Sequence, residues 1–176
     1  WHPSGFDADE ITGGSRGKHW FGDHVGVRAT YVDESRAGED YTLAAGDITL
    51  RAGRGTYLKA EYSQTESFSA PVFFSDNGGL TFTQLNPVGP REGEAKAIEA
   101  RVNFRELGWT EHDWSAAAWW RRVGAGYSVS RFDNGLDIEE QGVEFLGQFT
   151  PSLGLYARYS QAERGGESLD QAQITG

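Results

Sequence analysis

The feature that most constrains this chain is a pair of alternating segments, residues 141–150 and 153–163, joined by Pro151 and Ser152. Side chains of a β-strand point to opposite faces in turn, so residues two apart share a face. Each segment therefore has one apolar and one largely polar face. In the second segment the apolar face carries Leu153, Leu155, Ala157 and Tyr159. The pattern predicts an antiparallel hairpin with strands of about ten residues and a very tight turn.

The same alternation recurs along most of the chain. It predicts further strands over residues 24–32, 41–52, 56–65, 95–105, 113–122 and 169–175. The predicted fold is therefore all-β, an antiparallel up-and-down meander of about eight strands.

Two regions do not follow the alternation. Residues 1–23 show no sustained period and contain Gly13, Gly14 and Gly17, so we expect an irregular N-terminal segment there. The β-sheet is expected over residues 24–176, interrupted by a long loop at 66–94. Within that loop an alternating run at 80–85 predicts a small hairpin with residues 72–75.

The predicted connections alternate in length along the chain. Those at 53–54 and 150–152 are short, those at 33–40, 66–94 and 123–137 are long, 106–112 is intermediate and 163–168 is polar. Outer-membrane β-barrels sort their connections in this way, with short turns on one side of the membrane and long loops on the other. A soluble sandwich has no reason to do so. The pattern favours a transmembrane β-barrel or a partial barrel wall.

Composition narrows the function classes. The chain has 176 residues, 24 Gly, 6 Trp, 7 Tyr, 10 Phe, no Cys and a net charge of −10. Without Cys there is no disulfide framework or thiolate metal site. The acidic balance argues against a nucleic-acid partner, whose phosphates require clustered Lys and Arg. A mean hydropathy of −0.57 fits a barrel with a polar interior and a soluble protein equally well.

The alternation also assigns side chains to the two faces of a barrel wall, whose outward apolar band is expected to be about 25 Å tall. The predicted lumen-facing residues are Arg28, Arg51, Lys59, Glu61, Glu99, Arg101, Glu144 and Arg158. The predicted lipid-facing residues are Val27, Leu50, Leu58, Val102, Phe145 and Leu155. The predicted aromatics at the membrane interface are Trp119, Trp120 and Tyr159. The alternative is that the charged residues form the solvent face of an open sheet.

Searches for catalytic and metal-binding patterns give no positive signal. His2, His19, His24 and His112 lack metal-ligand spacing, and no nucleophile elbow or phosphate-binding loop occurs. Residues 133–135 are predicted to be a turn, since the later ligand positions of a calcium loop do not follow. An acidic group at residues 33–40 could hold a divalent cation against lipopolysaccharide, although a solvated loop is the better explanation. We predict no catalysis, no cofactor and no metal site.

A family resemblance adds to this interpretation. Residues 149–160 and 55–62 resemble strands and turns of Gram-negative outer-membrane β-barrels, and residues 71–84 are similar to segments in the barrel regions of large proteobacterial surface proteins. The resemblance implies an outer-membrane location, with membrane lipid and lipopolysaccharide as partners. Such barrels usually end on an aromatic residue, which Thr175 and Gly176 do not match. We therefore expect a section of a larger barrel, completed by further strands or domains of a longer chain.

Three functions follow as hypotheses. The first is an outer-membrane β-barrel section that forms a pore, a transporter wall or a membrane anchor. The second is a complete small eight-stranded barrel for adhesion or ligand binding through the 66–94 loop. The third is a soluble β-sandwich that binds carbohydrate, with Trp119 and Trp120 in a groove.

Overall fold

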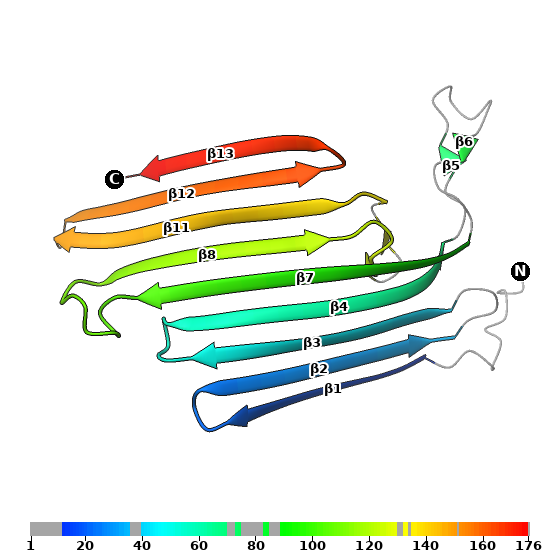
Figure 1. Cartoon of the computed structure of the whole chain (residues 1–176), viewed down its shortest axis with the longest axis horizontal. Helices are drawn as coiled ribbons and strands as arrows, with labels where there is room; N and C mark the ends of the chain where they lie inside the picture. Colours follow the sequence, from blue (N-terminus) through cyan, green and yellow to red (C-terminus); the bar gives the residue numbers. More distant parts are fainter. Residues whose placement is uncertain are drawn as a thin grey trace, which may run out of the picture.

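A computed structural model describes residues 12–35, 40–69, 73–74, 83–84, 89–129, 132–133, 135–150 and 152–175. Nine strands form one antiparallel meander, in the order β1-β2-β3-β4-β7-β8-β11-β12-β13 (Figure 1). Two short hairpins, β5–β6 and β9–β10, form separate two-stranded sheets. The strands are β1 Thr12–Phe21, β2 Val25–Glu34, β3 Tyr41–Arg51, β4 Tyr57–Ser69, β5 Phe73–Phe74, β6 Thr83–Gln84, β7 Gly89–Asn103, β8 Trp114–Val123, β9 Ser128–Val129, β10 Phe132–Asp133, β11 Ile138–Thr150, β12 Leu153–Arg164 and β13 Glu167–Thr175. The predicted all-β meander is confirmed, with nine strands instead of about eight.

The additional strand is β1, so the prediction of an irregular segment over residues 1–23 is wrong for residues 12–21. β1 pairs with β2 along its whole length, from Thr12 opposite Glu34 to Phe21 opposite Val25. Its alternation is hidden in the sequence because glycine, serine and histidine occupy most positions of one face. β1 is therefore a strand because it pairs with β2, although its own sequence shows no clear apolar alternation.

The connections keep most of the predicted alternation. The strand ends that flank residues 22–24, 52–56 and 151–152 lie at one end of the sheet, and those that flank 35–40, 70–88 and 124–137 lie at the other (Figure 1). The last connection departs from the pattern, because only Gly165 and Gly166 separate β12 from β13. Both glycines have positive φ, at 56° and 90°, as a type I′ hairpin turn requires. The predicted small hairpin within 66–94 is present as β5 paired with β6.

Among the described residues the meander is an open sheet, with β1 and β13 as its edge strands. With nine antiparallel strands, the two outer ones, β1 and β13, run in the same direction. They cannot pair with each other in an antiparallel ladder. An antiparallel closed sheet would need an odd number of additional strands between them.

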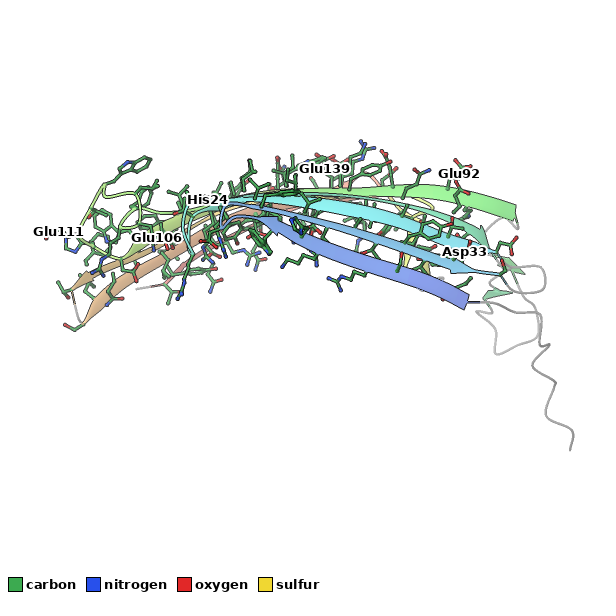
Figure 2. All side chains as sticks on the ribbon, turned by 90° about the horizontal axis from the view of Figure 1, so that it is seen from below. His24, Asp33, Glu92, Glu106, Glu111 and Glu139 are labelled. Atoms are coloured by element: carbon green, nitrogen blue, oxygen red, sulfur yellow. The ribbon has the colours of Figure 1, made fainter. Side chains whose placement is uncertain are left out.

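The sheet has two chemically different faces. The apolar face, defined by the register, carries Val27, Ile48, Leu50, Leu58, Ile98, Val102, Val143, Phe145 and Leu155. The polar face carries Arg28, Asp47, Arg51, Lys59, Glu61, Glu99, Arg101, Arg121, Glu140, Glu144 and Arg158. Figure 2 shows the sheet bowed, with Glu92 and Glu139, which belong to the apolar face by register, on the convex side. The polar face is therefore concave.

Burial is the reverse of that in a soluble protein. Large side chains of the apolar face remain open, with Leu58 at 44% and Val143 at 54% exposure. Among the described residues Tyr41 is the one buried hydrophobic side chain. Soluble domains bury their apolar sheet face against a second layer. The described residues contain no such layer.

Two three-strand clasps hold the polar face together, each built from a glycine, a tryptophan and an arginine. In the first, the Trp119 ring of β8 lies against Gly142 of β11, and the Arg158 guanidinium of β12 lies 4.7 Å above the ring. In the second, Trp20 of β1 lies against Gly26 of β2, with Arg51 of β3 4.7 Å from the ring. The glycine gives the space into which the ring fits, and the cation covers the ring's other side.

The first clasp predicts that Gly142→Ala destabilises the sheet. A Cβ at residue 142 would overlap the Trp119 ring, and overpacking of this kind typically costs about 1–3 kcal/mol. The free energy of unfolding measured in urea should fall by that amount. Gly46→Ala is the matched control, because a Cβ there meets its nearest atom at 3.7 Å. Equal stability of the two variants would contradict the clasp.

A polar contact joins two turns at the end of the sheet that carries the short turns. The Gly55 N–H donates to both carboxylate oxygens of Glu106, each at 2.9 Å, and so lowers the pKa of Glu106 below its ordinary value. Asn103 supports the same turn by accepting, through Oδ1, from the N–H groups of Arg105 and Glu106. The contact between the turns therefore depends on an ionised Glu106.

A depressed carboxyl pKa contributes stability above the ordinary glutamate pKa of about 4.3, and this contribution is lost as the pH falls through the folded-state value. Glu106→Gln should therefore be less stable than the wild type at pH 7, with the difference disappearing once the pH has fallen below the folded-state pKa of Glu106. Urea unfolding as a function of pH measures it. Glu111→Gln, an exposed position in the same turn, should leave the profile unchanged.

Candidate functional site: the polar concave face

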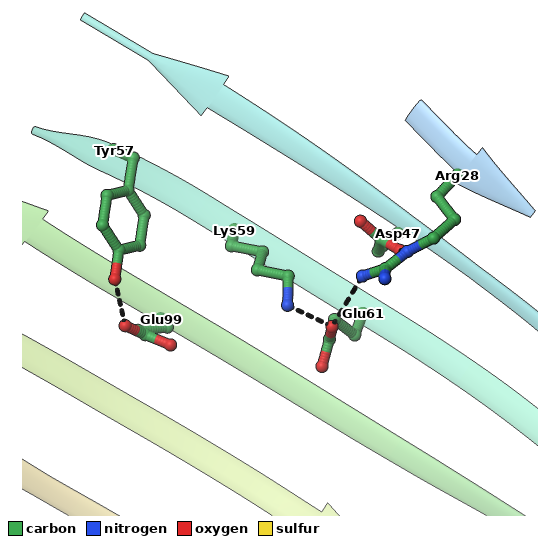
Figure 3. Close-up of polar contacts among 6 residues, drawn as sticks. All are labelled: Arg28, Asp47, Tyr57, Lys59, Glu61 and Glu99. Atoms are coloured by element: carbon green, nitrogen blue, oxygen red, sulfur yellow. Dashed lines mark hydrogen bonds and ion pairs between the residues drawn. The ribbon is translucent and has the colours of Figure 1, made fainter. Parts of the chain in front are cut away.

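Charged side chains form a network over β2, β3 and β4 (Figure 3). Arg28 pairs with Asp47 on the neighbouring strand, and its Nη2 lies 3.7 Å from Glu61 two strands away. Lys59 pairs with the same Glu61 carboxylate. An arginine that reaches over a whole strand can do so because side chains converge on a concave surface.

The network continues over β7, β8, β11 and β12. The Tyr57 hydroxyl donates to Glu99 at 2.5 Å. Arg101 of β7 reaches over β8 to Glu144 of β11 at 3.4 Å, and Tyr156 donates to the other oxygen of Glu144 at 3.2 Å. A further set, Arg121, Trp119 and Glu140, is joined through the Glu140 carboxylate.

A hollow of about 430 Å³ lies over this part of the polar face. Its wall includes Glu61, Glu99, Arg101, Trp119, Arg121, Glu140, Glu144 and Arg158. The charged groups are of both signs and are partly open, with the Glu144 side chain 23% exposed. Paired charges that retain access to water escape the full cost of burial. The arrangement can line a hydrated passage for polar solutes, whereas the pairing leaves little free charge for acid–base chemistry.

The structure groups the predicted face residues as follows. All eight predicted lumen-facing residues share the polar face, and all six predicted lipid-facing residues share the apolar face. Whether these faces meet a lumen and lipid stays a prediction. Trp120 and Tyr159 lie on the apolar face, but Trp119 departs from the predicted grouping. Its indole lies on the polar face and donates to Glu140 at 3.2 Å.

The sequence interpretation missed several members of the network: Trp20, Asp47, Tyr57, Arg121 and Glu140. Asp47 and Tyr57 are in phase with residues that it named, so the alternation could have identified them. Arg121 was ambiguous because Arg122 follows it and adjacent residues cannot share a face. Register with β11, which places Arg121 opposite Glu140, decides that case.

Aromatic side chains mark both ends of the apolar face. Towards the short turns lie Phe21, Trp114 and Phe149, and towards the long connections lie Tyr31, Tyr62, Trp120 and Tyr159. Between them a hollow of about 580 Å³ extends over a patch of alanines that includes Ala100, Ala118 and Ala157. Trp114 and Trp120 are six residues apart on β8, roughly 20 Å along the strand. This band is shorter than the expected height of about 25 Å.

The position of the apolar band along the strand shifts, relative to the paired residues, from each strand to the next. On β2 the band covers residues 25–31, so its midpoint along the strand is at the level of Arg28. On β12 it covers residues 153–159, so its midpoint is at the level of Tyr156. The register from Arg28 runs through Asp47, Glu61, Ala97, Arg121 and Glu140 to Ala162. The band has therefore moved six residues in six strand-to-strand steps. With about 3.3 Å per residue and about 4.8 Å between strands, the strands are tilted by about 35° to the band's normal.

The described residues contain no group of three or more His, Cys, Asp or Glu side chains arranged to hold a metal. His24 Nδ1 lies 2.8 Å from the Arg51 carbonyl, His19 packs edge-on against Phe21 and His112 stacks on Trp114. His2 and the acidic loop residue Glu39 lie outside the described residues. The predicted absence of catalysis, cofactor and metal stays a prediction.

Comparisons with known proteins leave this geometry as the basis for a functional proposal. No family model, curated protein or solved structure matches the chain. In the part of the chain that the structure describes, we find no helix with the length and apolarity to span a membrane.

Hydration of the polar face can be tested at the Arg101–Glu144 pair. Glu144→Gln removes the ion pair but keeps an oxygen that accepts from Tyr156. If the face is hydrated, the free energy of unfolding should fall by about 1 kcal/mol or less. Removing one partner of a truly buried pair costs about 3–5 kcal/mol. A loss of that size in urea unfolding would show that this face is dry.

Proposed function

We propose that this chain is a section of the wall of an outer-membrane β-barrel in a Gram-negative bacterium, serving as a pore, a transporter wall or a membrane anchor. Its convex apolar face contacts lipid hydrocarbon, and its concave polar face lines a hydrated lumen. Lipopolysaccharide surrounds the end with the long connections. Further strands of a longer chain complete the barrel.

The drift of the apolar band is the observation that carries the proposal. A hydrocarbon layer is perpendicular to the barrel axis, so strands tilted to that axis must shift their apolar residues in register from one strand to the next. The tilt of about 35° matches the roughly 35–45° of outer-membrane barrel strands. Aromatic rows at both borders of the band correspond to the interfacial girdles of such barrels.

The second hypothesis, a complete eight-stranded barrel, has less support. The meander has nine strands, and its outer strands run in the same direction. Closure between them would require a parallel pair. A wall completed by additional strands avoids this difficulty.

The third hypothesis, a carbohydrate-binding sandwich, needs a tryptophan with a free ring face for stacking on a sugar. Trp119 has none, since Gly142 lies under one face and Arg158 over the other. Trp120 lies on the opposite side of the sheet, where its Nε1 donates to Glu139 at 2.8 Å. The two rings do not form one groove.

Lipid contact predicts an asymmetric response to charge on the two faces. Leu58→Arg should reduce insertion of the complete protein, because an arginine on the lipid face near the midplane costs roughly 2–4 kcal/mol. Glu99→Gln, on the adjacent strand but on the polar face, should insert normally. Resistance of the membrane fraction to urea extraction measures insertion. Equal insertion of the two variants would count against lipid contact.

Single cysteines give an independent test, since the chain has none of its own. Cysteines replacing Val27, Val102 or Phe145 should react with a membrane-soluble maleimide and resist a charged one. Those replacing Arg28, Glu99 or Arg158 should show the opposite preference. The proposal is falsified if positions on the apolar face react with the charged reagent as fast as those on the polar face.

A further inference from the structure

The segment that follows β8 does not extend away from the sheet but returns over its polar face. We call residues 124–128 the strap. Gly124 N–H donates to the Glu94 carbonyl at 2.8 Å, Tyr127 N–H donates to the Gly124 carbonyl at 3.1 Å, and Gly126 has a φ of 94°. These features turn the backbone back towards β7 directly after the strand ends.

From there the strap crosses the inner side of three strands in succession. It passes over β7 at Gly93, where a Cβ would coincide with the Tyr127 backbone. On β4, Ser63 Oγ donates to the Tyr127 hydroxyl at 2.8 Å, and Thr65 Oγ1 accepts from Ser128 N–H at 3.1 Å.

The strap ends on β3, where the Tyr41 hydroxyl donates to the Ser128 carbonyl at 3.1 Å. The most deeply buried side chains described in this protein lie at this contact: Thr65 and Ser128 at 1% and Tyr41 at 4% exposure. The strap is therefore seated on the sheet by defined hydrogen bonds in a closely packed site.

The position of the strap gives it a role in the proposed pore. Ser63 and Thr65 follow Glu61 on the polar face of β4, so the strap lies beside the charged network, on the side of the long connections. In the proposed pore, solute that enters from that side would pass beside the strap. Its surroundings on the sheet carry hydroxyl groups in place of the paired charges.

We propose that the strap is the constriction of the lumen and determines the size of polar solute that passes. This inference rests on the proposed function, in its pore or transporter form. Gly93 is the residue that allows the strap to seat, because any side chain there would occupy the position of the strap backbone. Hydroxyl groups from Tyr41, Ser63 and Thr65 hold it in place.

The test uses Gly93→Ala in the complete protein, reconstituted into liposomes, with Gly46→Ala as the matched glycine control. Liposome swelling with neutral sugars of increasing size reports permeation. Gly93→Ala should raise the uptake of the larger sugars severalfold, and Gly46→Ala should not. A second variant combines Thr65→Cys with Ser128→Cys, so that a disulfide formed on oxidation holds the strap on β4. Oxidation should keep sugar uptake at or below the wild-type level, and reductant should reverse any decrease.

Seating of the strap is measured separately by thiol labelling of Ser128→Cys. This substitution loses no hydrogen bond, because Ser128 Oγ has no partner in the described structure. The cysteine should be protected from labelling when residue 93 is glycine and should be labelled when it is alanine.

Unchanged labelling, or faster labelling without a change in sugar uptake, overturns the constriction. A protein that inserts but stays impermeable in both forms also overturns it, while leaving a membrane anchor. A protein that does not insert overturns the proposed function as well.

Discussion

The distribution of polarity over a bent sheet is the constraint on which the rest of this structure depends. Ionic side chains occupy the concave face, where they meet over distances of two strands, as Arg28 does with Glu61 and Arg101 with Glu144. Apolar side chains occupy the convex face and remain open. A soluble sheet with this curvature would place its apolar side inward. The inversion supports the proposed wall, in which the ionic network would face a lumen and the apolar face would contact lipid.

The described residues bury almost no hydrophobic side chain, and glycine notches provide much of their close packing. Gly142 and Gly26 each accept a tryptophan ring from the neighbouring strand, and Gly93 accepts the backbone of the strap. In each case the missing side chain lets another group lie directly on the sheet. The two tryptophan clasps also extend to a third strand through a cation. Stability in this protein thus depends on contacts over the polar face as well as on the backbone ladder.

The two ends of the sheet are held by different chemistry. At the short turns, Glu106 accepts from Gly55 and joins two turns through a single carboxylate. At the long connections, hydroxyl groups of β3 and β4 hold the strap against the inner face. The first arrangement leaves the polar face open, and the second covers part of it. A passage through such a wall would therefore be asymmetric.

Eight of the nine main strands and their faces could be predicted from the sequence, because period-two alternation records which side chains share a surface and depends on no distant contact. It identified Arg28, Glu99 and Arg158 as one group in this way. It did not identify β1, whose glycines and serine hide the period, or the polar position of Trp119. Tertiary structure decided these, along with the band's drift and the strap's seat on Gly93. Each depends on which strand lies opposite which residue, and register is a property of pairing between distant segments.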